Sequence, residues 1–297
     1  MTYRSFDEVK GKDKKSYDSF TEFMRFCHEK KEILSVGRID ALKRLNPMLK
    51  EMYDSFRHVD ILANAVEYAF GYDDFAYSNQ SVRTLLQTPG DVSERKWCAY
   101  TFLITLGLRV CPYCNEQYIA PSLSKDGKVR GDLDHFLPKS EYPYFALSIY
   151  NMIPCCKFCN SSLKSSKEFM NTETATPYEV SYNDCFKFLG VKEKNKWTIQ
   201  IRKDGNTGEC VSEILKIFLI RERYQHHTDI VKDYLKKQKE YSDRLVEKIK
   251  NAYPNGHVCS FLSDYFGYPL KAEDIDKNVL NKLKRDLAEG LLHHSLM

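Results

Sequence analysis

The chain has 297 residues and a formal net charge of +4, and hydrophobic residues make up 42% of it. This length suits one large domain or two small ones, and the hydrophobic share is enough for a core. The small net charge excludes a global electrostatic demand for a nucleic-acid partner, so any basic character that matters is local. We see no membrane-spanning apolar run, signal-peptide pattern, repeat or Gly-rich phosphate loop. We therefore expect a cytoplasmic protein in a reducing compartment, with no membrane partner.

Residues 1–108 predict a helical N-terminal region. Residues 1–15 are polar and lysine-rich, which is typical of a loose terminus. Apolar residues at helical spacing then predict a series of helices, over 16–31, 39–45 and 60–69, with a further turn or helix from Pro47. A last helix opens at Ser93 and leads into the central stretch.

The central stretch, residues 109–170, contains two Cys-x-x-Cys pairs. They are Cys111 with Cys114 and Cys156 with Cys159. One tight turn aims two thiolates at one point, and two such turns make a tetrahedral four-thiolate zinc site. The separation exceeds the ~15–20 residues of a simple zinc ribbon, so the zinc would pin the base of an inserted unit. Reduced buried thiols are the alternative, and Cys155 is a less well spaced competitor for the second pair.

The inserted segment carries an adjacent aspartate and histidine. Residues 129–136 alternate as a strand, and Pro138 ends it and begins a loop. Asp134 and His135 point to opposite faces of an extended chain. This arrangement suits one as a metal ligand and the other as a base across a scissile group; a structural histidine is the alternative.

A short helix is predicted over residues 157–168, after the second cysteine pair. Asn160 falls in its first turn, and Lys164 lies four residues later on the same face. Lys139, Lys164 and Lys167 are candidates to neutralise substrate phosphates, although a solvated surface charge explains each equally well. A strand pair, a loop and a helix that bring Asp, His and Asn together make a ββα-metal unit.

The pattern C-P-Y-C, D-H-F-x-P-K-S, N-x-I-P and C-x-x-C-N resembles the zinc-containing HNH endonucleases over residues 111–167. The longer phrase LDHFLPKSEYPYFALSIYNMIPCCKFCNSSLKSSK is similar to the prokaryotic HNH group that includes the Septu anti-phage nuclease subunit. The resemblance implies that His135 is the general base and that Asp134 and Asn160 bind a catalytic divalent ion. Asn151 would tie the loop between the strands. Asn160 replaces the family's frequent last histidine, and its amide oxygen suits Mg²⁺ or Mn²⁺.

Residues 171–297 predict a mainly helical C-terminal region with one short hairpin. Residues 196–202 alternate as a strand, and the turn signal at Asp204 pairs them with the region of Glu209. A long helix is predicted over 212–251 and a final one over 272–292. His227 lies on the apolar stripe of the long helix and is interpreted as a core histidine. The alternative places it with Arg221 and Arg223 at a phosphate.

The expected fold class is α+β, a mostly helical chain around a small ββα-metal (HNH) core with a four-cysteine zinc site. The expected function is hydrolysis of phosphodiester bonds in DNA by a metal-dependent endonuclease. The resemblance adds a role in anti-phage defence with a separate ATPase partner. The alternatives are a non-catalytic zinc module that binds nucleic acid or protein, and an RNA-cleaving toxin with the same site.

Overall fold

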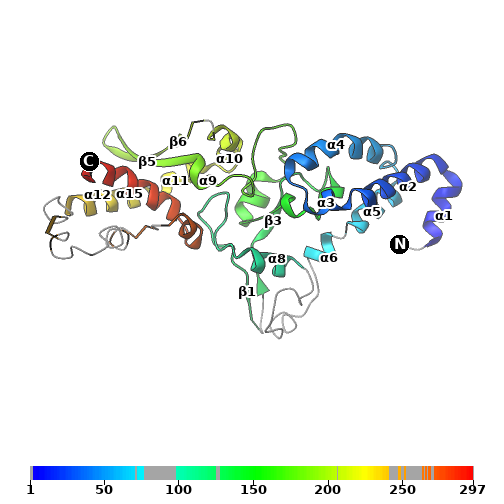
Figure 1. Ribbon diagram of the computed structural model, residues 1–297, viewed down its shortest axis with the longest axis horizontal. Helices are drawn as coiled ribbons and strands as arrows, with labels where there is room; N and C mark the ends of the chain where they lie inside the picture. Colours follow the sequence, from blue (N-terminus) through cyan, green and yellow to red (C-terminus); the bar gives the residue numbers. More distant parts are fainter. Residues whose placement is uncertain are drawn as a thin grey trace. The chain divides into compact units, whose positions relative to one another are not determined.

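The computed structural model describes residues 3–70, 72–76, 98–124, 128–205, 207–240, 247–248, 251, 263, 265, 267–268 and 271–296 (Figure 1). Among these residues the chain is mostly helical and forms three two-stranded sheets. The predicted α+β class with small sheets is therefore confirmed.

Two compact units make up the chain, and both are discontinuous in sequence. Unit 1 comprises residues 1–106, 121–154 and 165–172. Unit 2 comprises residues 107–120, 155–164 and 173–297. The predicted boundaries near 108 and 170 follow a different division, because the stretch 109–170 contributes to both units.

The N-terminal part of unit 1 is a set of helices. They are α1 (Tyr3–Lys12), α2 (Lys14–Glu29), α3 (Lys31–Val36), α4 (Ile39–Asp54), α5 (Asp60–Ala69), α6 (Tyr72–Ala76) and α8 (Ala99–Leu106). Phe23, Tyr53 and Phe56 pack their rings together between α2 and the end of α4, with centroids 5.4 to 6.0 Å apart. Aromatic burial of this kind is what turns isolated amphipathic helices into a packed layer.

Two expectations for this region were wrong. Residues 3–12 form α1 rather than a loose terminus, and α2 follows at once because Asp13 caps it through a 3.1 Å bond from the Ser16 amide. Pro47 does not start a new element but lies inside α4. Leu42, Leu49 and Tyr53 are buried along that helix, and this burial outweighs the backbone hydrogen bond that proline cannot donate. The predicted start at Ser93 lies outside the described residues.

Two of the small sheets contain strands of unit 1. In the first, β1 (Ser122–Leu123) pairs with β2 (Lys128–Val129) in antiparallel fashion; in the second, β3 (Asp132–His135) pairs with β4 (Met152–Cys155). The strand predicted over 129–136 is therefore two strands, interrupted before Asp132. The 3₁₀ turns between β3 and β4 are Pro143–Phe145 and Ile149–Asn151. Leu133 of β3 and Met152 of β4 pack with Phe102 in a buried cluster, which anchors the strand pair on α8.

Unit 2 is built on the hairpin of β5 (Phe186–Glu193) and β6 (Lys196–Lys203), with Phe186 opposite Lys203 and Glu193 opposite Lys196. The predicted pairing of β6 with the Glu209 region was wrong, because the partner strand precedes β6. Lys194 and Asn195 have φ of 45° and 65°, and positive φ at both central residues is the type I′ turn that two-residue hairpins need.

The helices of unit 2 lie on either side of this hairpin in sequence. They are the π-helix Phe158–Lys164, α9 (Tyr182–Cys185), the 3₁₀ turn Glu209–Val211, α10 (Ser212–Ile217), α11 (Ile220–Tyr224), the 3₁₀ turn Gln225–His227, α12 (Thr228–Glu240), the 3₁₀ helix Ala272–Lys277 and α15 (Asn281–Leu296). Of these, α9, α11, α12 and α15 contact the hairpin. Figure 1 shows α12 and α15 beside the β5–β6 hairpin, where Val231 and Leu287 approach Gly190.

Both long helices predicted for this region were wrong in extent. The helix expected over 212–251 is broken at Leu219, whose φ of 50° is left-handed, and residues 241–246, 249 and 250 lie outside the described residues. The last helix begins at Asn281 rather than near residue 272, because a separate 3₁₀ helix occupies 272–277. Apolar periodicity continues across both breaks, so the pattern alone does not reveal them.

Candidate metal centre and candidate catalytic residues

The four paired cysteines meet at one point in unit 2. The Sγ atoms of Cys111, Cys114, Cys156 and Cys159 all lie within 4.8 Å of one another, and all four residues are buried. Cys114 Sγ and Cys156 Sγ are 3.9 Å apart, close to the roughly 3.8 Å that two thiolates of a tetrahedral Zn–S site subtend at 2.3 Å bonds. Cys155 is buried but is not part of this cluster.

Each cysteine pair is shaped by a backbone turn that closes on its first residue. The Asn115 amide donates to the Cys111 carbonyl at 2.8 Å, and the Asn160 amide donates to the Cys156 carbonyl at 3.0 Å. Asn115 has a left-handed φ of 51°, which asparagine tolerates better than most residues. Both turns therefore present two sulfur atoms on one side.

The cluster needs a cation if its thiols are to ionise together. Burial raises the pKa of the Cys111 thiol, and the hydrogen bond from Cys111 holds the pKa of Cys156 far below its usual range. Such opposed shifts arise because neighbouring thiolates repel one another while each favours a thiol as its donor. A divalent ion at the centre removes the conflict. The donor set and spacing fit, so these four cysteines could hold a metal ion such as zinc.

The surroundings of the cluster contain residues that the sequence did not connect with it. Tyr224 donates its hydroxyl hydrogen to the Cys114 carbonyl at 2.6 Å. Asn115 accepts the Lys282 amide at 3.1 Å, and this bond ties the first cysteine pair to α15. Glu116 forms an ion pair with Arg223, and its Oε1 is hydrogen-bonded to His227 Nε2 at 2.9 Å. His227 is thus a hydrogen-bonded histidine, but it is half-buried rather than in the core as expected.

Asp134 and His135 lie side by side in sequence on β3 of unit 1. Their exposed fractions are only 2% and 8%. His135 Nε2 lies 2.9 Å from the Ala146 carbonyl oxygen. A carbonyl can only accept, so Nε2 carries the hydrogen and the lone pair of the neutral ring is at Nδ1. The loop thereby selects one tautomer of the histidine.

Asn151 holds the loop that supplies this carbonyl. Its Oδ1 accepts the Leu137 amide at 2.7 Å, and its Nδ2 donates to the carbonyls of Leu137 at 3.0 Å and Phe145 at 3.1 Å. The Phe136 amide also donates to the Asn151 carbonyl at 2.9 Å. One fully buried amide therefore joins the two ends of the loop next to the residue that contacts His135, while any part in catalysis stays a prediction.

Tyr72 of α6 is a further residue at this histidine. Its ring lies 4.4 Å from the His135 ring, edge to face, and Lys139 places its ammonium 4.6 Å from the same tyrosine ring. Tyr72 is far from the motif in sequence, so nothing in the pattern of residues 111–167 could have indicated it. The tyrosine connects the candidate base with an exposed lysine of the same loop.

The remaining predicted residues are distributed over both units. Asn160 is the third residue of the π-helix Phe158–Lys164 in unit 2, where it is half-buried. Lys164 ends that helix and is only 1% exposed, which is not the environment of a solvated surface charge. Lys167 belongs to unit 1 and is exposed. The prediction that Asp134 and Asn160 share one ion rests on the resemblance.

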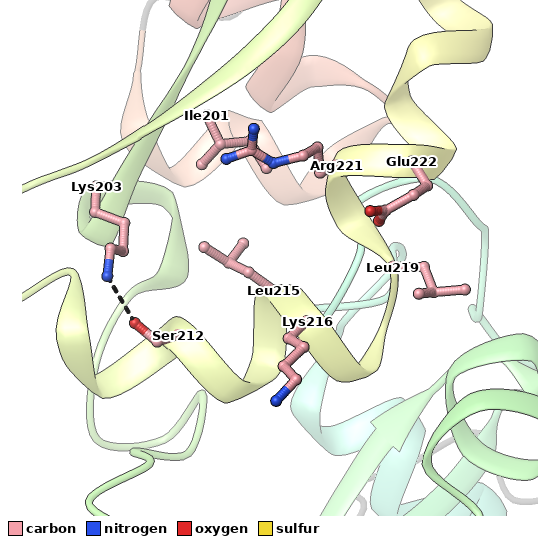
Figure 2. Close-up of a pocket in the computed structure, with 8 residues that line it drawn as sticks. All are labelled: Ile201, Lys203, Ser212, Leu215, Lys216, Leu219, Arg221 and Glu222. Carbon is pink, nitrogen blue, oxygen red and sulfur yellow. Dashed lines mark hydrogen bonds between the residues drawn. The ribbon is translucent and has the colours of Figure 1, made fainter.

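Unit 2 also contains an open groove of about 410 Å³ between β6 and the helices α10 and α11 (Figure 2). It is lined by Ile201, Lys203, Ser212, Leu215, Lys216, Leu219, Arg221 and Glu222. Lys203 pairs with Glu209 and donates to Ser212 at 3.0 Å, and Lys216 lies 4.0 Å from Glu213. Of the charged residues that line the groove, Lys203, Lys216 and Arg221 are cationic and Glu222 is acidic.

In comparisons with known proteins, no family model, no curated protein and no solved structure matches this chain. Among the described residues, no helix has both the length and the apolar character that crossing a bilayer requires.

Proposed function

We propose that this protein is a metal-dependent endonuclease of the HNH kind that hydrolyses phosphodiester bonds in DNA. The observation that carries the proposal is the arrangement at His135. A buried aspartate and histidine share a short strand, and the loop that follows fixes the histidine tautomer through Ala146. A binding module has no need for a histidine held with a defined lone pair, whereas a general base does.

In this mechanism the Nδ1 lone pair of His135 takes a proton from a water molecule, which attacks the phosphorus. By the resemblance, Asp134, on the opposite face of the strand, and Asn160 would be the protein ligands of the divalent ion. When bound, a hard ion such as Mg²⁺ or Mn²⁺ polarises the phosphate and stabilises the leaving oxygen. Lys139 lies beside Tyr72 near the histidine and neutralises a flanking phosphate. Asn151 keeps the loop closed, so the ring orientation does not depend on the substrate.

Zinc as the ion of the four-cysteine cluster is supported by the donor set and spacing of the cluster itself. The sequence resemblance supports the other finer assignments, DNA as the substrate and Mg²⁺ or Mn²⁺ as the catalytic ion. It also supports a defence role with a separate ATPase partner. We retain these as parts of the proposal, and each has its own test, since cleavage, metal content and partner binding are measured separately.

Cleavage of plasmid DNA and of RNA with Mg²⁺ or Mn²⁺ tests the proposal directly. His135→Ala is expected to lose at least the ~10²-fold that a general base contributes, with DNA binding retained. His58→Ala is a matched control, since that histidine of unit 1 is 63% exposed. Equal cleavage by the two variants would eliminate His135 as the base, and DNA binding without cleavage by the wild type would favour a binding module. Preferential RNA cleavage would support the toxin alternative.

A further inference from the structure

The Arg223 guanidinium of unit 2 contacts Cys159 of the second cysteine pair and Glu116, which follows the first pair. Its Nη1 donates to Cys159 Sγ at 3.6 Å and to the Phe218 carbonyl at 3.4 Å. Its Nη2 pairs with Glu116, two residues after Cys114. The side chain is only 17% exposed, so this cation is largely removed from water. Burying a charge in this way is costly unless it is paired and hydrogen-bonded.

The backbone at Leu219 directs this arginine toward the sulfur atoms. Leu219 caps α11 in the left-handed conformation, with φ of 50°, and separates α11 from α10. A leucine in this region is strained and persists only where surrounding contacts fix it. The Arg223 amide donates to the Leu219 carbonyl at 2.9 Å, so the first turn of α11 starts from the strained residue. The strain thus accompanies a change of helix direction that brings Arg223 to Cys159.

The charges around the cluster explain why an arginine is needed there. Four thiolates and one divalent ion leave two negative charges, since cysteines bind metal in the deprotonated form. The carboxylate of Glu116 adds another negative charge to the same environment, at 15% exposure. Arg223 lies between the two, and an N–H donor to a thiolate sulfur stabilises the charged form. Without Arg223, the negative charge of the metal-loaded cluster and the negative charge of Glu116 would repel each other with no cation between them.

We propose that Arg223 is an outer partner of the metal-loaded four-cysteine cluster, which offsets thiolate charge at Cys159 and slows loss of the ion. Glu116 holds the guanidinium in place, and His227 holds the other oxygen of Glu116. This role concerns retention of metal and is independent of any nuclease activity.

The experiment compares zinc retention in the full-length, zinc-loaded protein and in its variants. Zinc affinity is measured by competition with a chromogenic chelator, together with the rate of zinc release. Arg223→Met is expected to weaken zinc binding about 10- to 100-fold, as loss of outer partners of metal ligands commonly does. Arg223→Lys, which keeps the charge but not the planar fork, should fall between Arg223→Met and wild type. Arg221→Met is the matched control, since Arg221 is an exposed neighbour on the same helix.

The absorption spectrum of the cobalt-substituted protein distinguishes the proposed role of Arg223 from a purely structural one. In the cobalt-substituted protein, loss of the N–H···S bond should shift the sulfur-to-cobalt charge-transfer band of Arg223→Met but not that of Arg221→Met. An unshifted band, or a zinc affinity equal to that of Arg221→Met, would overturn the proposal. If Arg223→Met does not fold, Arg223→Lys decides in the same way: wild-type affinity and band position count against the proposal, and intermediate values support it.

Discussion

The loop around His135 and Asn151 in unit 1 and the four-cysteine cluster in unit 2 are held by contacts of very different sequence separation. The bonds around His135 and Asn151 join residues only 6 to 14 positions apart. In unit 2, Cys114 meets Cys156 across 42 positions, and Asn115 bonds Lys282 across 167. A loop closed by short-range neutral bonds keeps its shape largely by itself. A cluster assembled from distant segments instead depends on the folding of the whole unit, and on ions that compensate one another.

The largest expected effect is the removal of a cluster cysteine. Cys111→Ser should abolish zinc binding and destabilise unit 2, since structural zinc contributes on the order of 10 kcal/mol to small domains. Elemental analysis and thermal unfolding check this, with Cys155→Ser as the control because Cys155 is buried beside the cluster but outside it. A purified protein that contains no zinc and takes up none would end the metal-centre hypothesis.

The buried ionic network of α15 should give the next largest effect. Lys282, 2% exposed, donates to the Phe186 carbonyl at 2.6 Å and to Asp286 at 3.1 Å. Lys282→Met leaves Asp286 without one of its two cations, and breaking a buried pair costs about 3–5 kcal/mol. Chemical denaturation measures this loss, with Lys284→Met, on the same helix, as the control. Equal stability of the two variants would mean that Arg285 alone satisfies Asp286.

The same lysine also predicts a pH dependence of stability. Burial lowers the pKa of Lys282 to about 8, from 10.5. Between these values the unfolded chain binds the proton and the folded chain releases it, so folding gains stability as pH rises through this window. The stability difference between wild type and Lys282→Met should therefore grow from about pH 8 upward and stay constant below it. A difference that does not change with pH would show that Lys282 keeps its proton when folded.

The third effect concerns the proposed zinc site and the proposed catalytic site, which should differ in how readily they exchange metal. Mild EDTA should abolish cleavage while the buried zinc stays, and Mg²⁺ or Mn²⁺ should restore it, because a divalent ion held by two protein oxygen ligands keeps several waters. Asn160→Ala should raise the Mg²⁺ needed for half-maximal cleavage about tenfold, roughly 1.4 kcal/mol, with the fold intact. Full activity of this variant at low Mg²⁺ would remove Asn160 from the ligand set.

The smallest effect concerns the tyrosine at the candidate base. Tyr72→Leu removes an aromatic contact worth about 0.5–1.5 kcal/mol, so the turnover number should fall several-fold through looser placement of His135. Tyr68→Leu, on the preceding helix and 76% exposed, serves as the control. Steady-state cleavage kinetics with unchanged thermal stability would separate positioning from packing, and identical turnover numbers would assign Tyr72 to the core alone.

Whether a feature could be predicted from the sequence depended on the sequence separation of the residues that form it. The cysteine pairs and the Asp-His pair are local patterns whose chemistry dictates their spacing, and the loop closed by Asn151 spans few residues, so these features could be predicted. Tyr72 reaches His135 through tertiary packing, and no local signal marks it. Arg223 was named only as a candidate phosphate contact, because its contact with Cys159 also depends on tertiary packing. The break at Leu219 was missed because a left-handed leucine is rare, and the hairpin was misassigned because Lys194 and Asn195 resemble an ordinary polar run.

The interleaving of the two units has a consequence for dissection of the chain. The polypeptide passes from one unit to the other five times, after residues 106, 120, 154, 164 and 172. No single cut therefore yields two fragments that each contain a whole unit. A fragment ending at 106 lacks the strand with His135, and one beginning at 173 lacks all four cluster cysteines. Truncation would disrupt both units. Point substitutions, or co-expressed complementary fragments, are therefore the suitable way to assign activities within this protein.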